Sequence, residues 1–334
     1  MKGLNRSLFS NCDMAIKIFG GYMKVKVLVT GGAGYLGSIL VPELLKQDYN
    51  VTVLDSFIYK QNSLAHVCSN PRFNVVKGDV RVPSTMKSLL KEADIIIPLA
   101  ALVGAPLCSK DPIGASTTNK DAIFWMLDNV SKDQRIIMPT TNSAYGSGEE
   151  NNYCTEESPL NPISLYAIEK VEVEKRLMEH SNSISFRLAT VFGMSPRMRI
   201  DLLVNDFTYR AVYDRFVVLF ESHFKRNYIH IRDVTKVFLH GIKNFEHMKG
   251  EIFNVGLSDA NVSKEELCKI IQKQLPSFVF FEASVGKDPD QRNYIVSNDK
   301  IEKTGYKPDF SLEMGIKELI KGYTMISNTK YGNL

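Results

Sequence analysis

Val25-Lys26-Val27-Leu28-Val29-Thr30-Gly31-Gly32-Ala33-Gly34-Tyr35-Leu36-Gly37 is the stretch that decides the fold of this chain. Its apolar first half is typical of a buried β-strand, and a glycine-rich turn and a helical pattern come after it. This order places a helix N-terminus where it binds the pyrophosphate of a dinucleotide. We expect Gly31 to allow the tight turn, Gly34 to admit the phosphates and Gly37 to let the helix pack on the strand. Tyr35 and Leu36, at the start of the helix, are expected to contact the same cofactor.

A carboxylate ends the next predicted strand, at residues 50–55. An acid about 20 residues beyond the glycines accepts hydrogen bonds from the adenosine ribose, and its charge repels a 2′-phosphate. Asp55 therefore favours NAD as the cofactor. Lys60 lies nearby, so NADP stays an alternative cofactor. The alternative role for Asp55 is to cap a turn.

Composition excludes several classes of protein. The chain has 334 residues, of which 44% are hydrophobic and 23% charged, as in an ordinary globular protein. A net charge of +4 is too small to indicate a nucleic-acid partner. No apolar run is long enough to span a membrane. Five scattered cysteines without a C-x-x-C pair, and six histidines without metal-ligand spacing, predict a cytoplasmic protein with no metal.

Short apolar runs alternate with helical patterns through the first half of the chain. We predict strands at 25–30, 50–55, 73–77, 94–99, 135–139 and 184–189, and helices at 35–47, 84–91, 113–130 and 165–180. This alternation is typical of βαβ units with right-handed crossovers. The expected fold class is α/β, a Rossmann doubly wound parallel sheet.

The second half predicts a smaller mixed α/β region. Helices are expected at 201–213, 233–246, 263–274 and 312–325, and short strands near 217–219, 227–230 and 252–255. We expect a flexible N-terminal extension at 1–22 and a dinucleotide-binding domain at 23–193, to which 225–257 return. Residues 194–224 and 258–334 are expected to form the substrate-binding region, with the ligands in the crevice between the two.

Tyr166-Ala167-Ile168-Glu169-Lys170 carries the chemistry. Residues i and i+4 share one face of a helix, so Tyr166 and Lys170 are expected to point into one cleft. An ammonium group near a phenol stabilises the phenolate, which can then act as a general base toward a substrate hydroxyl. Lys170 is also expected to hold the nicotinamide ribose. The pair alone is a weak signal, and the glycine-rich unit before it makes it a strong one.

The segment from Arg135 to Gly146 ends in Thr140-Thr141-Asn142-Ser143-Ala144-Tyr145-Gly146. With it, the sequence resembles the extended short-chain dehydrogenase/reductase family of nucleotide-sugar epimerases and dehydratases, from Met23 to about Lys321. The resemblance implies that Thr141 completes a Ser/Thr–Tyr–Lys triad and that Ser143 contacts the substrate. Strand-end hydroxyls that only cap a turn are the alternative for both.

Further segments resemble the same family. Gly78-Asp79-Val80 implies that Asp79 and Val80 approach the adenine, and Leu99, Ala100 and Ala101 match a strand end that lines the cofactor. The chain departs from the family at Pro98, where a histidine is usual. The resemblance further implies substrate contacts for Thr190, Asn205, Arg226 and Arg292, with both arginines on the diphosphate because guanidinium groups grip phosphate oxygens in pairs. Arg197 and Arg199 are additional cations near the expected site, and Arg199 is taken as a substrate ligand.

The two residues after Thr141 narrow the reaction. Dehydratases of the family usually carry an Asp-Glu pair there, whereas this chain has Asn142-Ser143 and no carboxylate for the loss of water. We therefore expect NAD-dependent chemistry at C4 of a nucleotide sugar, as a 4-epimerase or a 4-dehydrogenase/ketoreductase in surface-polysaccharide precursor synthesis. The segments at 98–108, 141–143 and 187–193 resemble bacterial enzymes that oxidise GDP-heptoses at C4.

Two alternative functions and the state of assembly stay open. A 4,6-dehydratase and a non-catalytic NAD-binding regulatory protein on the same fold are the alternative functions. Ile168, Val171 and Leu177 form an apolar stripe on the helix at 165–180. The stripe is either ordinary core or, as in relatives, half of a four-helix bundle in a homodimer.

Overall fold

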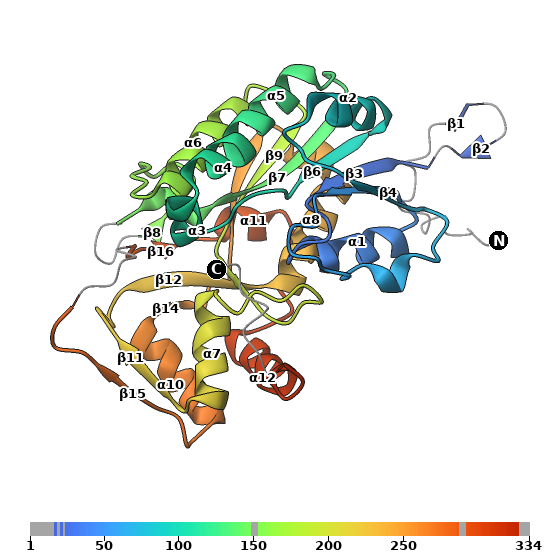
Figure 1. Cartoon of the computed structure of the whole chain (residues 1–334). Coiled ribbons are helices and arrows are strands. Elements are labelled where there is room, and N and C mark those ends of the chain that lie inside the picture. Colours follow the sequence, from blue (N-terminus) through green and yellow to red (C-terminus); the bar gives the residue numbers. More distant parts are fainter. Residues whose placement is uncertain (1–16, 19–20, 23, 148–152, 287–291, 327–334) are drawn as a thin grey trace, which may run out of the picture.

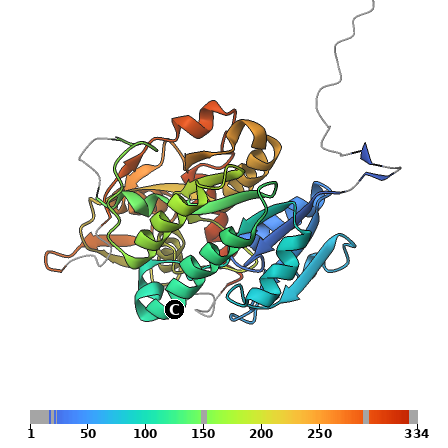
Figure 2. The same ribbon diagram turned by 90° about the horizontal axis from the view of Figure 1, so that it is seen from above.

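The structure is a computed structural model that describes residues 17–18, 21–22, 24–147, 153–286 and 292–326. Most of the expected N-terminal extension lies outside the described residues. Within it, β1 (Lys17–Ile18) and β2 (Gly21–Tyr22) pair as a short antiparallel hairpin. This hairpin lies away from the body of the molecule in both views (Figure 1, Figure 2).

A sheet of seven parallel strands forms the centre of the molecule, in the order β13-β9-β7-β6-β3-β4-β5. The strands are β3 (Lys26–Thr30), β4 (Asn50–Asp55), β5 (Phe73–Lys77), β6 (Ile95–Pro98), β7 (Arg135–Thr141), β9 (Ser183–Leu188) and β13 (Glu251–Val255). Along the chain, β4 and β5 extend the sheet from one side of β3. The later strands β6, β7, β9 and β13 then extend it from the other side. Because the strand order reverses there, a crevice is expected at the carboxyl ends of these strands. The Rossmann fold predicted from the sequence is confirmed.

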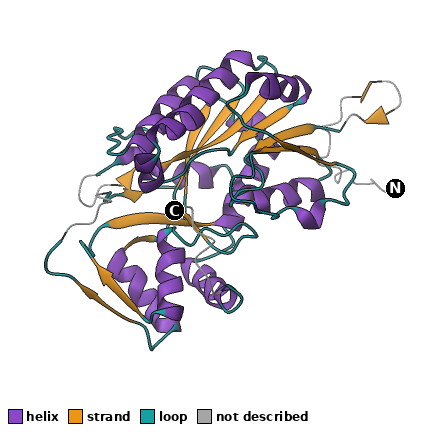
Figure 3. Cartoon of the chain, in the orientation of Figure 1, coloured by secondary structure: helices purple, strands orange, loops and turns teal. Residues whose placement is uncertain are grey.

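Helices cover both faces of this sheet (Figure 3). One face carries α1 (Gly37–Lys46) and α8 (Ile231–Lys243), and the other carries α2 (Pro83–Glu92), α5 (Ala122–Asn129) and α6 (Leu165–Leu177). Alternation along β3 supplies both cores, because successive side chains point to opposite faces of a strand. Val27 and Val29 pack with the α1 and α8 side chains, and Leu28 packs with those of α2, α5 and α6.

A second region with its own apolar core lies against the carboxyl ends of the strands (Figure 1). Its strands are β10 (Thr190–Phe192), β12 (Lys225–His230) and β14 (Asn261–Ser263) in one sheet, with β11 (Phe216–Leu219) and β15 (Val279–Glu282) in another. Its helices are α7 (Leu203–Tyr213), α10 (Lys264–Gln274) and α12 (Leu312–Tyr323). Of the segment expected to return to the Rossmann sheet, α8 and β13 do so. β12 instead belongs to the second region.

Short elements complete the described chain. They are α3 (Ala105–Lys110), α4 (Pro112–Ser116), α9 (Phe245–Met248), α11 (Asp299–Lys303), β8 (Tyr153–Cys154), β16 (Ile295–Val296) and two 3-10 turns, Ala65–Val67 and Asn142–Tyr145. The helix predicted over 113–130 is interrupted. A π-helical turn, Thr117–Asp121, separates α4 from α5. None of the helices in the described part of the chain combines the length and apolarity needed to cross a membrane.

Candidate active site

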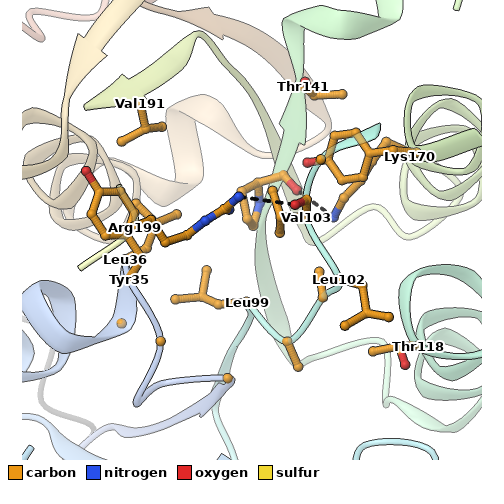
Figure 4. A pocket seen from close by; sticks show the side chains of 18 of the residues that line it. Tyr35, Leu36, Leu99, Leu102, Val103, Thr118, Thr141, Lys170, Val191 and Arg199 are labelled. Carbon is orange, nitrogen blue, oxygen red and sulfur yellow. Dashed lines mark hydrogen bonds between the residues drawn. The ribbon is translucent and has the colours of Figure 1, made fainter. Parts of the chain in front are cut away.

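A cavity of about 510 Å³ opens at the carboxyl ends of the central strands. Most of the site residues predicted from the sequence line this cavity. They come from the glycine-rich turn, four strand ends, α6 and the second region. They are Gly31, Gly34, Tyr35, Leu36, Gly37, Asp55, Asp79, Val80, Leu99, Ala100, Ala101, Thr141, Ser143, Tyr166, Lys170, Thr190, Arg199 and Arg292. Figure 4 shows Tyr35 and Leu36 on one side of the cavity, with Thr141 and Lys170 on the other.

The glycine-rich turn is closely packed against the segment that follows β6. Gly31 has a positive φ of 67°, and its N–H donates to the Leu54 carbonyl at 2.7 Å. A Cβ on Gly31 would lie 2.6 Å from the Ala100 nitrogen, and a Cβ on Gly37 would lie 2.4 Å from the Gly32 oxygen. Both positions therefore exclude a side chain, which is why glycine is required where α1 meets the strand.

Asp55 is held at the end of β4 by the turn itself. Its Oδ2 accepts a hydrogen bond from the Ala33 N–H at 3.0 Å, and its Oδ1 accepts one from the Phe57 N–H at 2.8 Å. Carboxylate oxygens have further lone pairs, so these bonds leave room for ribose hydroxyls. The turn-capping role and a ribose-binding role are thus compatible in one side chain.

Thr141, Tyr166 and Lys170 approach the cavity from the end of β7 and from the first turns of α6. Ser164 caps α6 by accepting the Ala167 N–H at 3.3 Å, which fixes where the helix begins. Thr141 Oγ1 accepts the Ser143 N–H at 3.1 Å, so it caps the following 3-10 turn and keeps its own hydroxyl proton as a donor. Lys170 Nζ donates to the Pro139 carbonyl at 3.4 Å, and an ammonium group has three such donors.

Burial dominates the acid–base properties of the pair. It raises the pKa of Tyr166 to about 12, and the guanidinium groups of Arg199 and Arg292 oppose this rise. It also lowers the pKa of Lys170 to about 8. The sequence predicted that Lys170 lowers the pKa of Tyr166 toward neutral pH. That role of Lys170 stays a prediction, and burial outweighs the opposing effect of the two arginines on the Tyr166 pKa.

Two of the arginines predicted as substrate ligands line the same cavity. Arg199 donates to the Val103 carbonyl at 3.2 Å (Figure 4). It also pairs with Asp201. Arg292 donates to the Ser143 hydroxyl. Both guanidinium groups can therefore meet an anionic ligand from the side of the second region.

Two predicted substrate ligands do not line the cavity. Asn205 is fully buried, donates to the Tyr35 hydroxyl and the Arg199 carbonyl, and accepts the Gly193 N–H. Its amide is therefore used within the protein rather than on a diphosphate. Arg226 is buried on β12 outside the lining.

Several lining residues were not predicted as ligands. Thr118 belongs to the π-helical turn, and Tyr59 lies in the loop after Asp55, where no spacing rule marks it. Arg197 also lines the cavity, and its guanidinium lies 4.2 Å from the centre of the Tyr59 ring. Arg81 could have been found, because it directly follows the Gly-Asp-Val segment.

The cavity fits a dinucleotide. Its length runs from Asp55, where a ribose would be held, past the glycine-rich turn to Tyr166 and Lys170. Within the described ranges, no cluster of three or more His, Cys, Asp or Glu side chains is arranged to hold a metal ion.

Two solved structures resemble the fold closely. The UDP-glucuronic acid 4-epimerase of Bacillus cereus, solved with UDP-glucuronic acid and NAD, gives a TM-score of 0.81 at 22% identity over 91% of this chain and 100% of that one. DesIV of Streptomyces venezuelae, a dTDP-glucose 4,6-dehydratase solved with NAD, gives 0.79 at 25% identity, covering 90% and 97% of the two chains.

Sequence relatives cover a similar span. A putative UDP-glucose 4-epimerase of Methanocaldococcus jannaschii is 26% identical over 311 residues, 88% of this chain and 97% of its own length. UDP-glucuronic acid decarboxylase 1 of Arabidopsis thaliana is 25% identical over 317 residues, 91% of this chain and 71% of its own length. The family model described as "NAD dependent epimerase/dehydratase family" matches residues 27–256. The chain therefore belongs to the NAD-dependent epimerase/dehydratase family, and NAD is its cofactor.

Proposed function

We propose that this protein carries out NAD-dependent redox chemistry at C4 of a nucleotide-activated sugar, as a 4-epimerase or as a 4-dehydrogenase/ketoreductase in surface-polysaccharide precursor synthesis. The observation that carries the proposal is that Thr141, Tyr166 and Lys170 line one cavity with the glycine-rich turn. Relatives named as nucleotide-sugar epimerases, decarboxylases and dehydratases support the substrate class.

The roles of the side chains follow from their chemistry. Bound NAD supplies the acceptor for the hydride that leaves the sugar carbon. Tyr166, as the phenolate, removes the proton of the hydroxyl on that carbon, and Thr141 hydrogen-bonds the same oxygen. Lys170 holds the ribose hydroxyls and stabilises the phenolate, while Arg199 and Arg292 bind the diphosphate.

Dehydration is the second candidate, supported by the likeness to the dTDP-glucose 4,6-dehydratase. The residues after Thr141 favour the first candidate. Asn142 is buried, and Ser143 is bound to Arg292, so neither supplies a carboxylic acid that would protonate a leaving hydroxyl.

Mass spectrometry of nucleotide sugars tests the proposal. GDP-, UDP-, CDP- and dTDP-sugars, heptoses included, are incubated with enzyme and NAD, with Tyr166→Phe as the control. Unchanged mass with altered chromatography indicates a 4-epimerase, and loss of two hydrogens indicates a dehydrogenase. Loss of water would contradict the interpretation of Asn142 and Ser143. No change in any pool would favour a non-catalytic NAD-binding protein.

A homodimer remains part of the proposal. Val171 and Leu177 of the α6 stripe are buried within the subunit, whereas Ile168 is 42% exposed. Ile168 is thus the side chain of that stripe that a partner subunit would cover. Light scattering of the purified protein, alone and as Ile168→Glu, tests the dimer.

A further inference from the structure

Glu169 directly precedes Lys170 on α6, and its carboxylate is buried. The residue is 1% exposed, and its Oε1 accepts a hydrogen bond from the Ser116 hydroxyl at the end of α4. Its Oε2 is inaccessible and has no hydrogen-bond partner among the described residues. A buried carboxylate oxygen without a donor is costly unless a nearby positive charge compensates it.

Two lysines are candidates for that compensation. Lys120, in the π-helical turn, pairs with Glu172 at 3.2 Å near the protein surface, and Glu169 adds a smaller contribution that raises the pKa of Lys120. Lys170 is buried beside the cavity, and its hydrogen bond to the Pro139 carbonyl is a long one. Of the two, Lys170 is therefore the buried cation without an ion pair in the described part of the chain, and Glu169 is the buried carboxylate next to it.

The other titratable groups around this part of α6 are mostly engaged with one another. They are Cys108 on α3, Lys120 and Asp121 on the π-helical turn, Asp128 on α5, Tyr145 after β7, Arg187 on β9, and Tyr166, Glu172, Glu174 and Arg176 on α6. Glu174 pairs with Arg187 at 2.6 Å, and Asp128 pairs with Arg176 at 2.6 Å. Cys108 is a buried thiol whose pKa burial raises to about 11, so it is neutral near pH 7. Glu169 is left as the buried carboxylate that neighbours Lys170 along α6 and has no ion pair in the described part of the chain.

We propose that Glu169 is a positioning residue that keeps Lys170 positively charged inside the cavity. It does not line the cavity and acts on the reaction only through Lys170. The consequence for catalysis rests on the proposed function, because a phenolate at Tyr166 needs a cation beside it. Burial opposes the charge on Lys170, whereas Cys108 and, after it, Glu169 favour that charge.

The first test measures Lys170 directly in the protein without ligands. Lysine side chains are labelled with 15N at Nζ and followed by NMR against pH, with the Lys170 resonance identified by its absence in Lys170→Arg. Glu169→Gln keeps the shape and the bond to Ser116 but removes the charge. We expect it to lower the Lys170 pKa by about one unit. Glu172→Gln likewise removes one negative charge, but from the exposed part of α6. It should leave the Lys170 titration unchanged, since solvent screens the Glu172 carboxylate.

The second test measures the pH dependence of kcat/KM with the nucleotide sugar found active. In Glu169→Gln the fall in activity at alkaline pH should begin about one unit lower, and Glu169→Asp should restore it. An unchanged Lys170 titration in Glu169→Gln, or an equal loss of activity at every pH, would overturn the inference and leave Glu169 a structural role. Because the NMR titration needs no substrate, it decides the inference even if the proposed reaction is wrong.

If Glu169→Gln does not fold, Ser116→Ala and Glu169→Asp take its place. Both keep the charge, so both should keep the Lys170 titration near that of the wild type. A shift in Ser116→Ala as large as one unit would show that the hydrogen bond, and not the charge, controls Lys170, and would overturn the proposal.

Discussion

Tyr166 is the side chain on which the proposed chemistry depends most directly. Tyr166→Phe removes the proton acceptor and little volume, so kcat should fall by about a hundredfold or more. Binding of NAD, measured by calorimetry, should be nearly unchanged. Tyr153→Phe is the matched control, because Tyr153 is exposed and lies outside the cavity lining. Turnover at the wild-type rate in Tyr166→Phe would show that another group is the base.

Lys170 shows that the site is built at the expense of stability. Burial lowers its pKa to about 8, net of the attraction from Glu169, so the folded protein disfavours the charge. Lys170→Met should therefore abolish turnover and raise the free energy of unfolding at pH 7 by about 2 to 3 kcal/mol. The gain is full below pH 8, where lysine is charged in both states. It should shrink between pH 8 and about 10.4, the ordinary lysine pKa, because the folded protein then loses the proton first.

Urea unfolding of wild type and Lys170→Met at pH 7 and at pH 10 measures this difference. A variant that is less stable than the wild type at pH 7 would contradict the prediction, since it would mean that the site stabilises the ammonium group.

At the scale of elements, the π-helical turn between α4 and α5 supports one wall of the cavity. Asn119 in this turn is buried, its Nδ2 donates to the Leu102 carbonyl at 2.9 Å, and its Oδ1 accepts the Leu102 N–H at 2.8 Å. Asn119→Ala should lower the free energy of unfolding by about 2 to 3 kcal/mol, because both Leu102 groups lose their partner. It should also weaken NAD binding, since Leu102 and Val103 line the cavity.

Asn129→Ala is the control for this element. Asn129 is exposed at the end of α5 and bonds only locally to the Trp125 carbonyl, so its loss should change stability by about 0.5 kcal/mol or less. Unfolding and NAD titrations that do not separate the two variants would show that the π-helical turn does not hold the wall.

The same elements show what the sequence could and could not predict. β3, its glycine turn and α1 were predictable, because local rules specify them: an apolar run, a positive φ at Gly31 and close packing at Gly37. The π-helical turn was not predictable. Asn119 within it bonds to Leu102, 17 residues earlier, and no periodicity encodes such a bond. Asn205 was misplaced for a similar reason, since its partners lie on three separate segments. Motif residues predicted the candidate site, and tertiary hydrogen bonds decide which of them line the cavity.

At the scale of the whole molecule, a buried junction joins the Rossmann sheet to the second region. Tyr35, two residues before α1, donates to the Gly193 carbonyl at 2.7 Å, and Asn205 on α7 donates to the Tyr35 hydroxyl at 3.2 Å. Asn205 also holds the Gly193 N–H and the Arg199 carbonyl, so one amide fixes both the junction and the segment that carries Arg199.

Asn205→Ala should therefore lower the free energy of unfolding by about 2 to 4 kcal/mol, because it leaves several buried groups without a partner. NAD affinity should fall as well, although Asn205 does not line the cavity. Tyr35→Phe removes the shared hydroxyl, and a double-mutant cycle should give a coupling of about 0.5 kcal/mol or more with Asn205→Ala. Additive effects would mean that the two side chains act independently and that the junction is not a unit.

Unfolding of each variant with and without NAD then separates the two roles of the junction, because a bound ligand stabilises only the folded state that it recognises. If Asn205→Ala lost stability but kept the full stabilisation by NAD, the junction would hold the two regions together without shaping the cavity between them.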